Sequence, residues 1–249
     1  MKAVLLLILI IFSTAIQAYS TNDIIGTDDR KRITAGMDAF YQTVGTIEFE
    51  GRTGYCTGTL ISPRHVLTSG HCVISQELFP ARKFEAKLIK FSPGRLDNAP
   101  GAAGVFRGES IESFDEWLRS GNDEFDVAVI KLDRDVPVAA GSIAPLALVK
   151  AGDDLRGVKL YLAGYSAGKE AGSLWEGEGE FVRTFELNQF FTHTIDTESG
   201  GSGSLIRRKT TKGWEVVGVH RGAADNLPVN VGILLSRTIR DAINRWIQL

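Results

Sequence analysis

Residues 197–206 read Thr-Glu-Ser-Gly-Gly-Ser-Gly-Ser-Leu-Ile and lie between two apolar, β-branched runs. Three glycines and three serines occupy these ten positions. Glycine lets the backbone turn tightly and approach another group closely. A serine hydroxyl held in such a turn, beside free N–H groups, suits acyl-transfer chemistry. Flexible loops are also rich in Gly and Ser, so this stretch alone leaves both interpretations open.

The N-terminus has the pattern of a secretory signal peptide. Lys2 supplies a positive charge, residues 3–12 are continuously apolar, and Ala15 or Ala18 could precede the cleaved bond. The apolar run is too short for a membrane span with a stop-transfer flank. We therefore expect residues 1–18 to be removed and the protein to be secreted, outside the cell or into a periplasm. An uncleaved N-terminal anchor is the alternative.

Composition narrows the range of partners. The chain carries 28 Lys and Arg against 30 Asp and Glu, a net charge of −2, with both signs interspersed. It has no basic patch with interleaved aromatic residues, so we expect no nucleic-acid partner. About 230 residues follow the signal peptide, enough for one large or two small cores. Cys56 and Cys72 predict one disulfide in an oxidising compartment, with two buried thiols as the alternative.

Short β-rich runs broken by Gly, Pro and Asp recur along the chain and predict a barrel or a sandwich. Examples are residues 44–49, 56–61, 65–68, 84–91, 126–132, 159–165 and 215–220. The C-terminus differs, because apolar residues recur at helical spacing from Leu235 to Ile247 and Ser236 can cap the start. We expect an amphipathic helix packed on the β-body there, and a linker between two halves at 133–145.

Two further residues could assist a serine nucleophile. His71 follows an apolar run beside Cys72, and a disulfide there would pin the backbone of a general base. Asp126 starts an apolar run, from which its carboxylate can turn inward, orient an imidazole and stabilise imidazolium. A structural histidine and a strand-start cap are the alternatives. The joint occurrence of His71, Asp126 and Ser202 favours catalysis.

Three motifs resemble those of the chymotrypsin-like serine proteases. Residues 56–72, ending in Thr-Ser-Gly-His-Cys, resemble the histidine motif of that family. Residues 126–130, Asp-Val-Ala-Val-Ile, resemble its aspartate motif, and residues 200–204, Gly-Gly-Ser-Gly-Ser, its nucleophile loop. The resemblance implies an all-β fold of two six-stranded antiparallel β-barrels with a C-terminal α-helix.

The branch that the sequence resembles most is the V8-like glutamyl endopeptidases. Residues 24–30, Ile-Ile-Gly-Thr-Asp-Asp-Arg, are similar to the start of those proteins. Thr-Ile-Asp-Thr at 194–197 and Val-Gly-Val-His at 217–220 also match. The resemblance implies an N-terminal barrel over 24–136, carrying the histidine and the aspartate, and a C-terminal barrel over 137–249, carrying the serine.

The resemblance also implies the role of each group. Ser202 attacks the scissile carbonyl, His71 takes and returns the proton, Asp126 orients His71, and the N–H groups of Gly200 and Ser202 form the oxyanion hole. Ser199 is the competing nucleophile, because residues 198–202 mimic the trypsin loop. We prefer Ser202, because glycine suits the strained oxyanion position two residues before the nucleophile.

Specificity is expected for Glu, then Asp, before the cleaved bond. By resemblance, Thr197 and His220 face a substrate carboxylate, which a histidine and a hydroxyl suit. Asp196 lies six residues before Ser202, where trypsin places the aspartate that attracts Arg and Lys, so tryptic specificity is the first alternative. An inactive homologue that binds a partner through the same fold is the second.

Activation is expected to differ from that of trypsin. Trypsin-like zymogens insert a new amine beside an aspartate directly before the nucleophile, and that position is Gly201 here. We expect residues 19–23 to be a pro-segment of a zymogen, with maturation near Asp23-Ile24 and the new amine helping to receive the substrate carboxylate. Cleavage at Arg32-Ile33 is the alternative.

No cofactor is expected. The four histidines, His65, His71, His193 and His220, show no metal-ligand spacing, although a calcium ion in a loop is left open. The expected partners are protein or peptide substrates of a monomeric hydrolase, with no membrane association once the signal peptide is removed.

Overall fold

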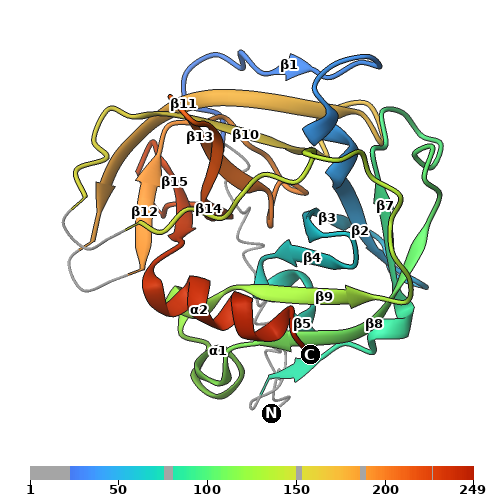
Figure 1. The fold of residues 1–249 in the computed structure, drawn as a ribbon. Coiled ribbons are helices and arrows are strands. Elements are labelled where there is room, and N and C mark those ends of the chain that lie inside the picture. Colours follow the sequence, from blue (N-terminus) through green and yellow to red (C-terminus); the bar gives the residue numbers. More distant parts are fainter. Residues whose placement is uncertain (1–22, 76–80, 150–152, 186–188, 226) are drawn as a thin grey trace, which may run out of the picture.

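The computed structural model describes residues 23–75, 81–149, 153–185, 189–225 and 227–249 (Figure 1). The expected signal peptide, and the expected pro-segment except for Asp23, lie outside these residues. The described chain folds into two antiparallel β-barrels with one C-terminal helix, which confirms the predicted fold class. Among the described residues, no helix is both long and apolar enough to cross a membrane.

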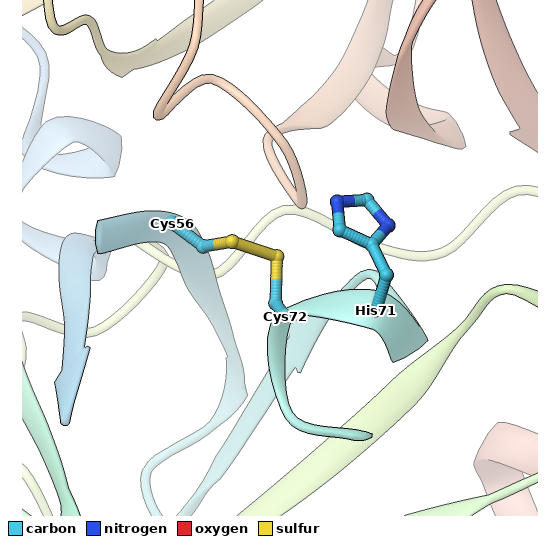
Figure 2. Close-up of side chains that lie close together, drawn as sticks. All are labelled: Cys56, His71 and Cys72. Atoms are coloured by element: carbon cyan, nitrogen blue, oxygen red, sulfur yellow. A yellow bond between two sulfur atoms is a disulfide. The ribbon is translucent and has the colours of Figure 1, made fainter. Parts of the chain in front are cut away.

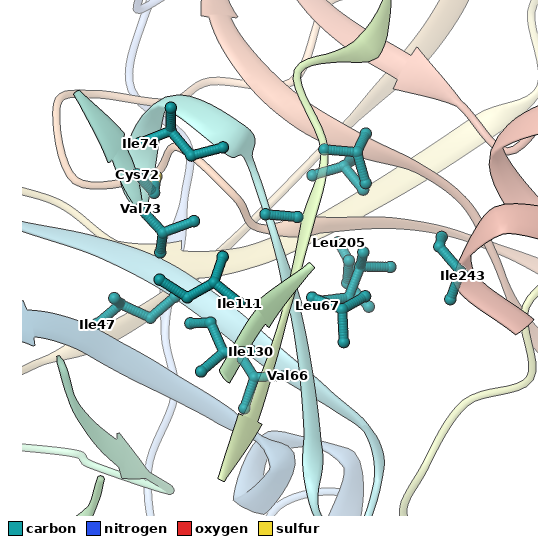
Figure 3. Packing of buried hydrophobic residues seen from close by; sticks show 14 of the residues in the cluster. Ile47, Val66, Leu67, Cys72, Val73, Ile74, Ile111, Ile130, Leu205 and Ile243 are labelled. Carbon is teal, nitrogen blue, oxygen red and sulfur yellow. The ribbon is translucent and has the colours of Figure 1, made fainter. Parts of the chain in front are cut away.

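The first barrel is a closed ring in the strand order β2-β3-β4-β9-β8-β7. Its strands are β2 (Val44–Phe49), β3 (Tyr55–Ser62), β4 (His65–Thr68), β7 (Ile89–Pro93), β8 (Phe106–Ser113) and β9 (Ala128–Leu132). Inward-facing side chains such as Ile47, Val66, Ile111 and Ile130 fill the interior (Figure 3). Burying each of them stabilises the fold by about 1.5–3 kcal/mol, so the ring firmly supports the turn after β4 and the turn before β9.

The second barrel has the strand order β11-β10-β13-β14-β15-β12, closed by pairing of β11 with β12. Its strands are β10 (Lys159–Tyr165), β11 (Leu174–Thr184), β12 (Phe190–His193), β13 (Leu205–Thr210), β14 (Gly213–Ala223) and β15 (Asn230–Leu234). The Gly/Ser-rich stretch 197–204 connects β12 to β13. Residues 133–145 run from β9 toward this barrel without a helix or a strand.

The N-terminal segment packs on the second barrel, although the chain then enters the first. The two-residue strand β1 (Lys31–Arg32) pairs with β11 at Glu176 and Trp175. Ile33, the next residue, donates its N–H to the carbonyl of Leu174 at 2.8 Å. Residues 23–33 therefore form a strap across the half of the molecule that holds Ser202.

The C-terminal helix α2 (Arg237–Trp246) confirms the prediction made from its apolar spacing. Ser236 caps it by accepting a hydrogen bond from the N–H of Ile239, and Ile239, Ala242 and Ile243 are buried. The helix runs toward the first barrel (Figure 1). There Trp246 packs against Phe114 with ring centroids 4.9 Å apart. It therefore ties the two barrels together.

The remaining elements are short. They are β5 (Ile74–Ser75), β6 (Arg82–Lys83), the helix α1 (Asp115–Ser120) and the 3-10 turns η1 (Ala39–Thr43), η2 (Gly70–Cys72), η3 (Ala86–Leu88) and η4 (Asp123–Phe125). Two of the turns position functional candidates, because η2 comes shortly after β4 and η4 ends one residue before Asp126.

Candidate active site

His71 lies in η2 at the end of β4, where a disulfide fixes the backbone. Cys72 is bonded to Cys56 of β3, as expected from the sequence, so η2 cannot move away from the barrel wall. Figure 2 shows the imidazole projecting from the turn beside this disulfide. About a third of the His71 side chain, 35%, is exposed, so the ring borders solvent.

Asp126 holds His71 through both of its carboxylate oxygens. Oδ2 lies 2.7 Å from His71 Nδ1, and Oδ1 accepts the backbone N–H of His71 at 2.7 Å. The Asp126 side chain is fully buried, so these contacts are shielded from water. The carboxylate is an acceptor only, so Nδ1 carries the proton and Nε2 of the neutral ring is left with a free lone pair. This arrangement suits a general base.

Ser202 lies in the loop between β12 and β13, and β3 of the first barrel is hydrogen-bonded to that loop. Thr57 of β3 donates its backbone N–H to the carbonyl of Ser202 at 2.9 Å and its hydroxyl to the carbonyl of Gly200 at 2.8 Å. The Ser202 hydroxyl is hydrogen-bonded to the carbonyl of Arg221 at 3.3 Å rather than to His71. Transfer of its proton to His71 therefore requires rotation of the Ser202 side chain.

Two N–H groups that the loop backbone leaves without a partner among the described residues flank Gly201. In the described part of the chain, the N–H groups of Gly200 and Ser202 donate to no protein atom. Gly200 has φ +96°, and a Cβ there would lie 2.5 Å from the ring of Tyr55, so only glycine fits. Ser199, the competing nucleophile, lies at the start of this turn, and its carbonyl accepts from Ala167 at 2.8 Å.

Arg221 joins Ser202 to the aspartate across the two barrels. Its carbonyl accepts from the Ser202 hydroxyl, and its Nε lies 3.5 Å from Asp126 Oδ2. Its Nη2 forms an ion pair with Asp123 Oδ1 at 2.7 Å. The three residues that the sequence singled out for catalysis are thus linked in one place. Sequence reasoning missed Arg221, and its position directly after His220 was the only available signal.

Thr197 and His220 both lie beside Gly201, in the loop that carries Ser202. A Cβ built on Gly201 would lie 3.7 Å from Cβ of Thr197 and 3.8 Å from Cδ2 of His220. Both side chains are buried, and the Thr197 hydroxyl has no hydrogen-bond partner among the described residues. A buried hydroxyl without a partner is costly, which is consistent with a ligand group completing it.

His220 is backed by a second buried histidine. Its Nδ1 lies 3.3 Å from Nε2 of His193, whose Nδ1 accepts the backbone N–H of Ile195 at 3.2 Å. That last bond places the proton of neutral His193 on Nε2, which donates it to His220. Neutral His220 must then carry its own proton on Nε2. Sequence reasoning found His220 but did not pair it with His193.

Burial keeps both histidines neutral. Burial first, and then the neighbouring His220, lowers the pKa of His193 well below its ordinary value. Burial first, and then the nearby His71 and Arg221, lowers the pKa of His220 to about 3, although a hydrogen bond with the Val231 backbone opposes this. At neutral pH His220 is therefore an uncharged hydrogen-bond donor.

Asp196 is occupied by the N-terminal strap. Its Oδ1 accepts the backbone N–H of Ile25 at 2.7 Å, and its Oδ2 lies 3.3 Å from the N–H of Asp29. The residue is only 3% exposed. The carbonyl of Asp23 accepts from the N–H of Thr197 at 3.2 Å. The carboxylate that suggested a tryptic pocket is thus a structural anchor.

Ligands for a metal ion do not gather at this site. Among the described residues, Cys56, His71 and Cys72 form the one group of His, Cys, Asp and Glu atoms close enough to share an ion. The two sulfurs are bonded to each other and offer no thiolate. These three residues therefore do not fit a bound metal ion.

The chain belongs to the family of trypsin-like peptidase domains, whose profile matches residues 56–219. It is a serine protease with the chymotrypsin-like fold. Glutamyl endopeptidase of Bacillus licheniformis is 27% identical over 244 residues, covering 94% of this chain and 72% of the relative. A Bacillus subtilis protein named extracellular metalloprotease is 26% identical, covering 93% and 72%.

Solved structures agree with this assignment. A Glu endopeptidase in complex with MPD has a TM-score of 0.76 at 27% identity, covering 91% of this chain and all of that one. The protease Anisep of Arthrobacter nicotinovorans has a TM-score of 0.64 at 18% identity, covering 82% and 94%. The relationship to glutamyl endopeptidases therefore extends over most of the chain.

Proposed function

We propose that this protein is a secreted serine endopeptidase that cleaves peptide bonds after Glu, and less readily after Asp. Its triad consists of His71, Asp126 and Ser202. The observation that carries the proposal is the fully buried carboxylate of Asp126, with both oxygens on His71, joined through Arg221 to the Ser202 hydroxyl. The relationship to glutamyl endopeptidases supports the same assignment.

The reaction begins when the Ser202 hydroxyl turns from the Arg221 carbonyl to His71 Nε2. Nε2 takes the proton as Oγ forms a bond to the scissile carbonyl carbon, and the negative oxygen is received by the free N–H groups of Gly200 and Ser202. His71 then protonates the amide nitrogen, the C–N bond breaks, and an acyl-enzyme remains. Water, deprotonated by His71, hydrolyses it and restores Ser202.

Selection of an acidic residue rests on two donors. The Nε2–H of His220 and the unpartnered hydroxyl of Thr197 can both donate to a substrate carboxylate. A carboxylate bound there also favours a proton on His220, since an opposite charge stabilises imidazolium. Tryptic specificity is disfavoured, because Asp196 already accepts two backbone N–H groups and is buried.

Cleavage of the Asp23–Ile24 bond during maturation would change the contacts of Thr197, one of the two proposed carboxylate donors. The Asp23 carbonyl accepts from Thr197 N–H and from Asn230 Nδ2 at 2.9 Å. Cleavage of the bond after Asp23 would release both donors and leave a new amine at Ile24. Asp196 would still hold Ile25. Removal of the pro-segment would therefore add positive charge beside Thr197, where the substrate carboxylate is proposed to bind.

Labelling by a fluorophosphonate probe tests the nucleophile separately from specificity. We expect the purified protein to be labelled, Ser202→Ala to lose labelling, and Ser199→Ala, three residues away in the same loop, to keep it. Loss of labelling in Ser199→Ala alone would reject Ser202. No labelling of the wild-type protein would favour an inactive homologue that acts as a binding module.

A peptide anilide panel with Glu, Asp, Gln, Arg or Lys before the cut bond tests specificity. We expect the order Glu, Asp, Gln, with no measurable cleavage after Arg or Lys. Ready cleavage after Arg, with none after Glu, would overturn the acidic preference while leaving the triad intact.

A further inference from the structure

Arg221 is a cation beside the proposed triad, and it comes from the other barrel. It belongs to β14 of the second barrel, whereas the two carboxylates it faces, Asp123 and Asp126, lie in and directly after η4 of the first. Its side chain is 30% exposed, so the guanidinium is partly shielded from water. No other residue among those described contacts Asp123, Asp126 and Ser202 together.

The guanidinium acts on Asp126 through charge rather than through a hydrogen bond. Arg221 Nε lies 3.5 Å from Asp126 Oδ2, the same oxygen that contacts His71 Nδ1. Nε has no hydrogen-bond partner among the described residues. The ion pair of Nη2 with Asp123 at 2.7 Å holds the guanidinium in this place. Asp123 thus fixes Arg221, and Arg221 faces Asp126.

We propose that Arg221 is a positioning residue that sets the pH range in which His71 acts as the general base. This inference rests on the proposed triad. The positive charge partly offsets the Asp126 carboxylate, so the imidazolium that forms on His71 during acylation is less stabilised than by the carboxylate alone. We therefore expect the acid limb of acylation to lie at lower pH with this cation than without it.

The charged groups around Arg221 determine the direction in which the acid limb of the pH profile should move when this residue is replaced. Asp123 and Asp126 face Arg221 from the first barrel, and His71 in η2 contacts the same oxygen of Asp126 that Arg221 faces. His220 directly precedes Arg221 on β14. His220 is neutral at neutral pH. Removing the Arg221 charge leaves the carboxylates unopposed, which favours imidazolium on His71. The acid limb of the reaction should then move to higher pH.

The test is the rate of fluorophosphonate labelling of Ser202 as a function of pH, because this rate requires unprotonated His71 but no particular substrate side chain. In Arg221→Gln the backbone carbonyl that contacts Ser202 is kept. We expect the midpoint of its acid limb to rise by about 0.5–1 pH unit. In Arg221→Lys the charge is kept, and we expect the midpoint to stay within about 0.3 unit of wild type.

Two further variants separate this effect from general changes in charge or fold. Arg237→Gln removes one positive charge from an exposed position of α2 and should leave the midpoint unchanged. Arg221→Met removes the same positive charge with a side chain that cannot donate a hydrogen bond, so the midpoint should rise as it does in Arg221→Gln. It gives a second test if Arg221→Gln does not fold.

The outcomes separate the role of Arg221 from the proposed triad. An unmoved midpoint in Arg221→Gln, or in Arg221→Met, would overturn the role of Arg221 while the triad stands. A rise as large in Arg221→Lys as in Arg221→Gln would also overturn it, because geometry rather than charge would then be responsible. Failure of the wild-type protein to react at any pH would instead overturn the proposed triad.

Discussion

The two barrels share one architecture but bury different groups at the site. Apart from Asp126, the first barrel directs hydroxyls toward the second, namely Thr57 on the carbonyl of Gly200 and Ser69 on the carbonyl of His220. The second barrel buries a histidine pair and an anchored carboxylate, Asp196. In the proposed mechanism, the first barrel supplies the proton-transfer pair, and the second supplies the nucleophile and the residues that select the substrate side chain.

The two sets of buried groups also differ in how their charge, and so the cost of burying them, depends on pH. The hydroxyls of the first barrel are neutral at any pH, whereas the buried imidazoles of the second become charged in acid. Burying a polar group is tolerable only where it is hydrogen-bonded, and burying a charge costs far more. We therefore expect the buried pair of His193 and His220 to make the second barrel sensitive to acid, whereas the proposed role of His220 is to donate to a substrate carboxylate.

The largest effect is expected from Asp126→Asn in the first barrel. An amide can no longer stabilise imidazolium and favours the wrong tautomer of His71, so kcat should fall about 10³–10⁴-fold. The fall should be equal for Glu and Gln substrates, because the pocket lies in the other barrel. Steady-state kinetics on both substrates measures it.

The matched control is Asp123→Asn, because Asp123 is a nearby carboxylate that is more exposed than Asp126. This substitution should change kcat less than tenfold. A change in the ratio of Glu to Gln cleavage in Asp126→Asn would contradict the division of roles between the barrels.

A smaller and selective effect is expected from His220→Leu in the second barrel. Loss of a hydrogen bond to a charged group costs about 1.5–3 kcal/mol, so kcat/KM for Glu substrates should fall roughly 10- to 150-fold. The rate of fluorophosphonate labelling should change little. The ratio of Glu to Gln cleavage is the direct measurement.

His65→Leu is the matched control, since it removes a buried histidine of the first barrel, which contacts Ser62 at 2.7 Å. It is expected to lower stability without changing selectivity. Equal loss of Glu preference in both variants would show that His220 acts only through the fold.

A third effect, the smallest of the three when counted per pH unit, is expected in the pH dependence of stability. The pKa of His220 is lowered to about 3 from 6.5, so the unfolded chain binds a proton that the folded protein does not between these pH values. Its contribution is therefore full above pH 6.5 and is lost progressively as pH falls toward 3. Each such histidine lowers the free energy of unfolding by up to about 1.4 kcal/mol per pH unit.

Urea denaturation of wild type and of His220→Leu at pH 7, 6, 5 and 4 checks this. The variant should lose less stability on acidification than wild type. Parallel losses in the two proteins would mean that His220 is not buried in the neutral form.

Much of the fold was predictable because its signals are local. Short β-rich runs predicted the strands, and the spacing from Leu235 to Ile247 predicted α2. The strap over residues 23–33 was not predicted to lie on the second barrel. Its pairing with β11 joins positions more than a hundred residues apart, which no local pattern reports.

The order of amino acids alone specifies which chemical groups the protein has and which turns hold them: a histidine beside a bridged cysteine, an aspartate before a strand, and a serine among glycines. Which charges meet depends on how the two barrels and the strap pack together. That packing placed Asp196 under the strap instead of in a cation pocket, and it brought Arg221 to Asp126. The reason is physical: a residue's type fixes what it can bind, but burial and distant neighbours fix what it does bind.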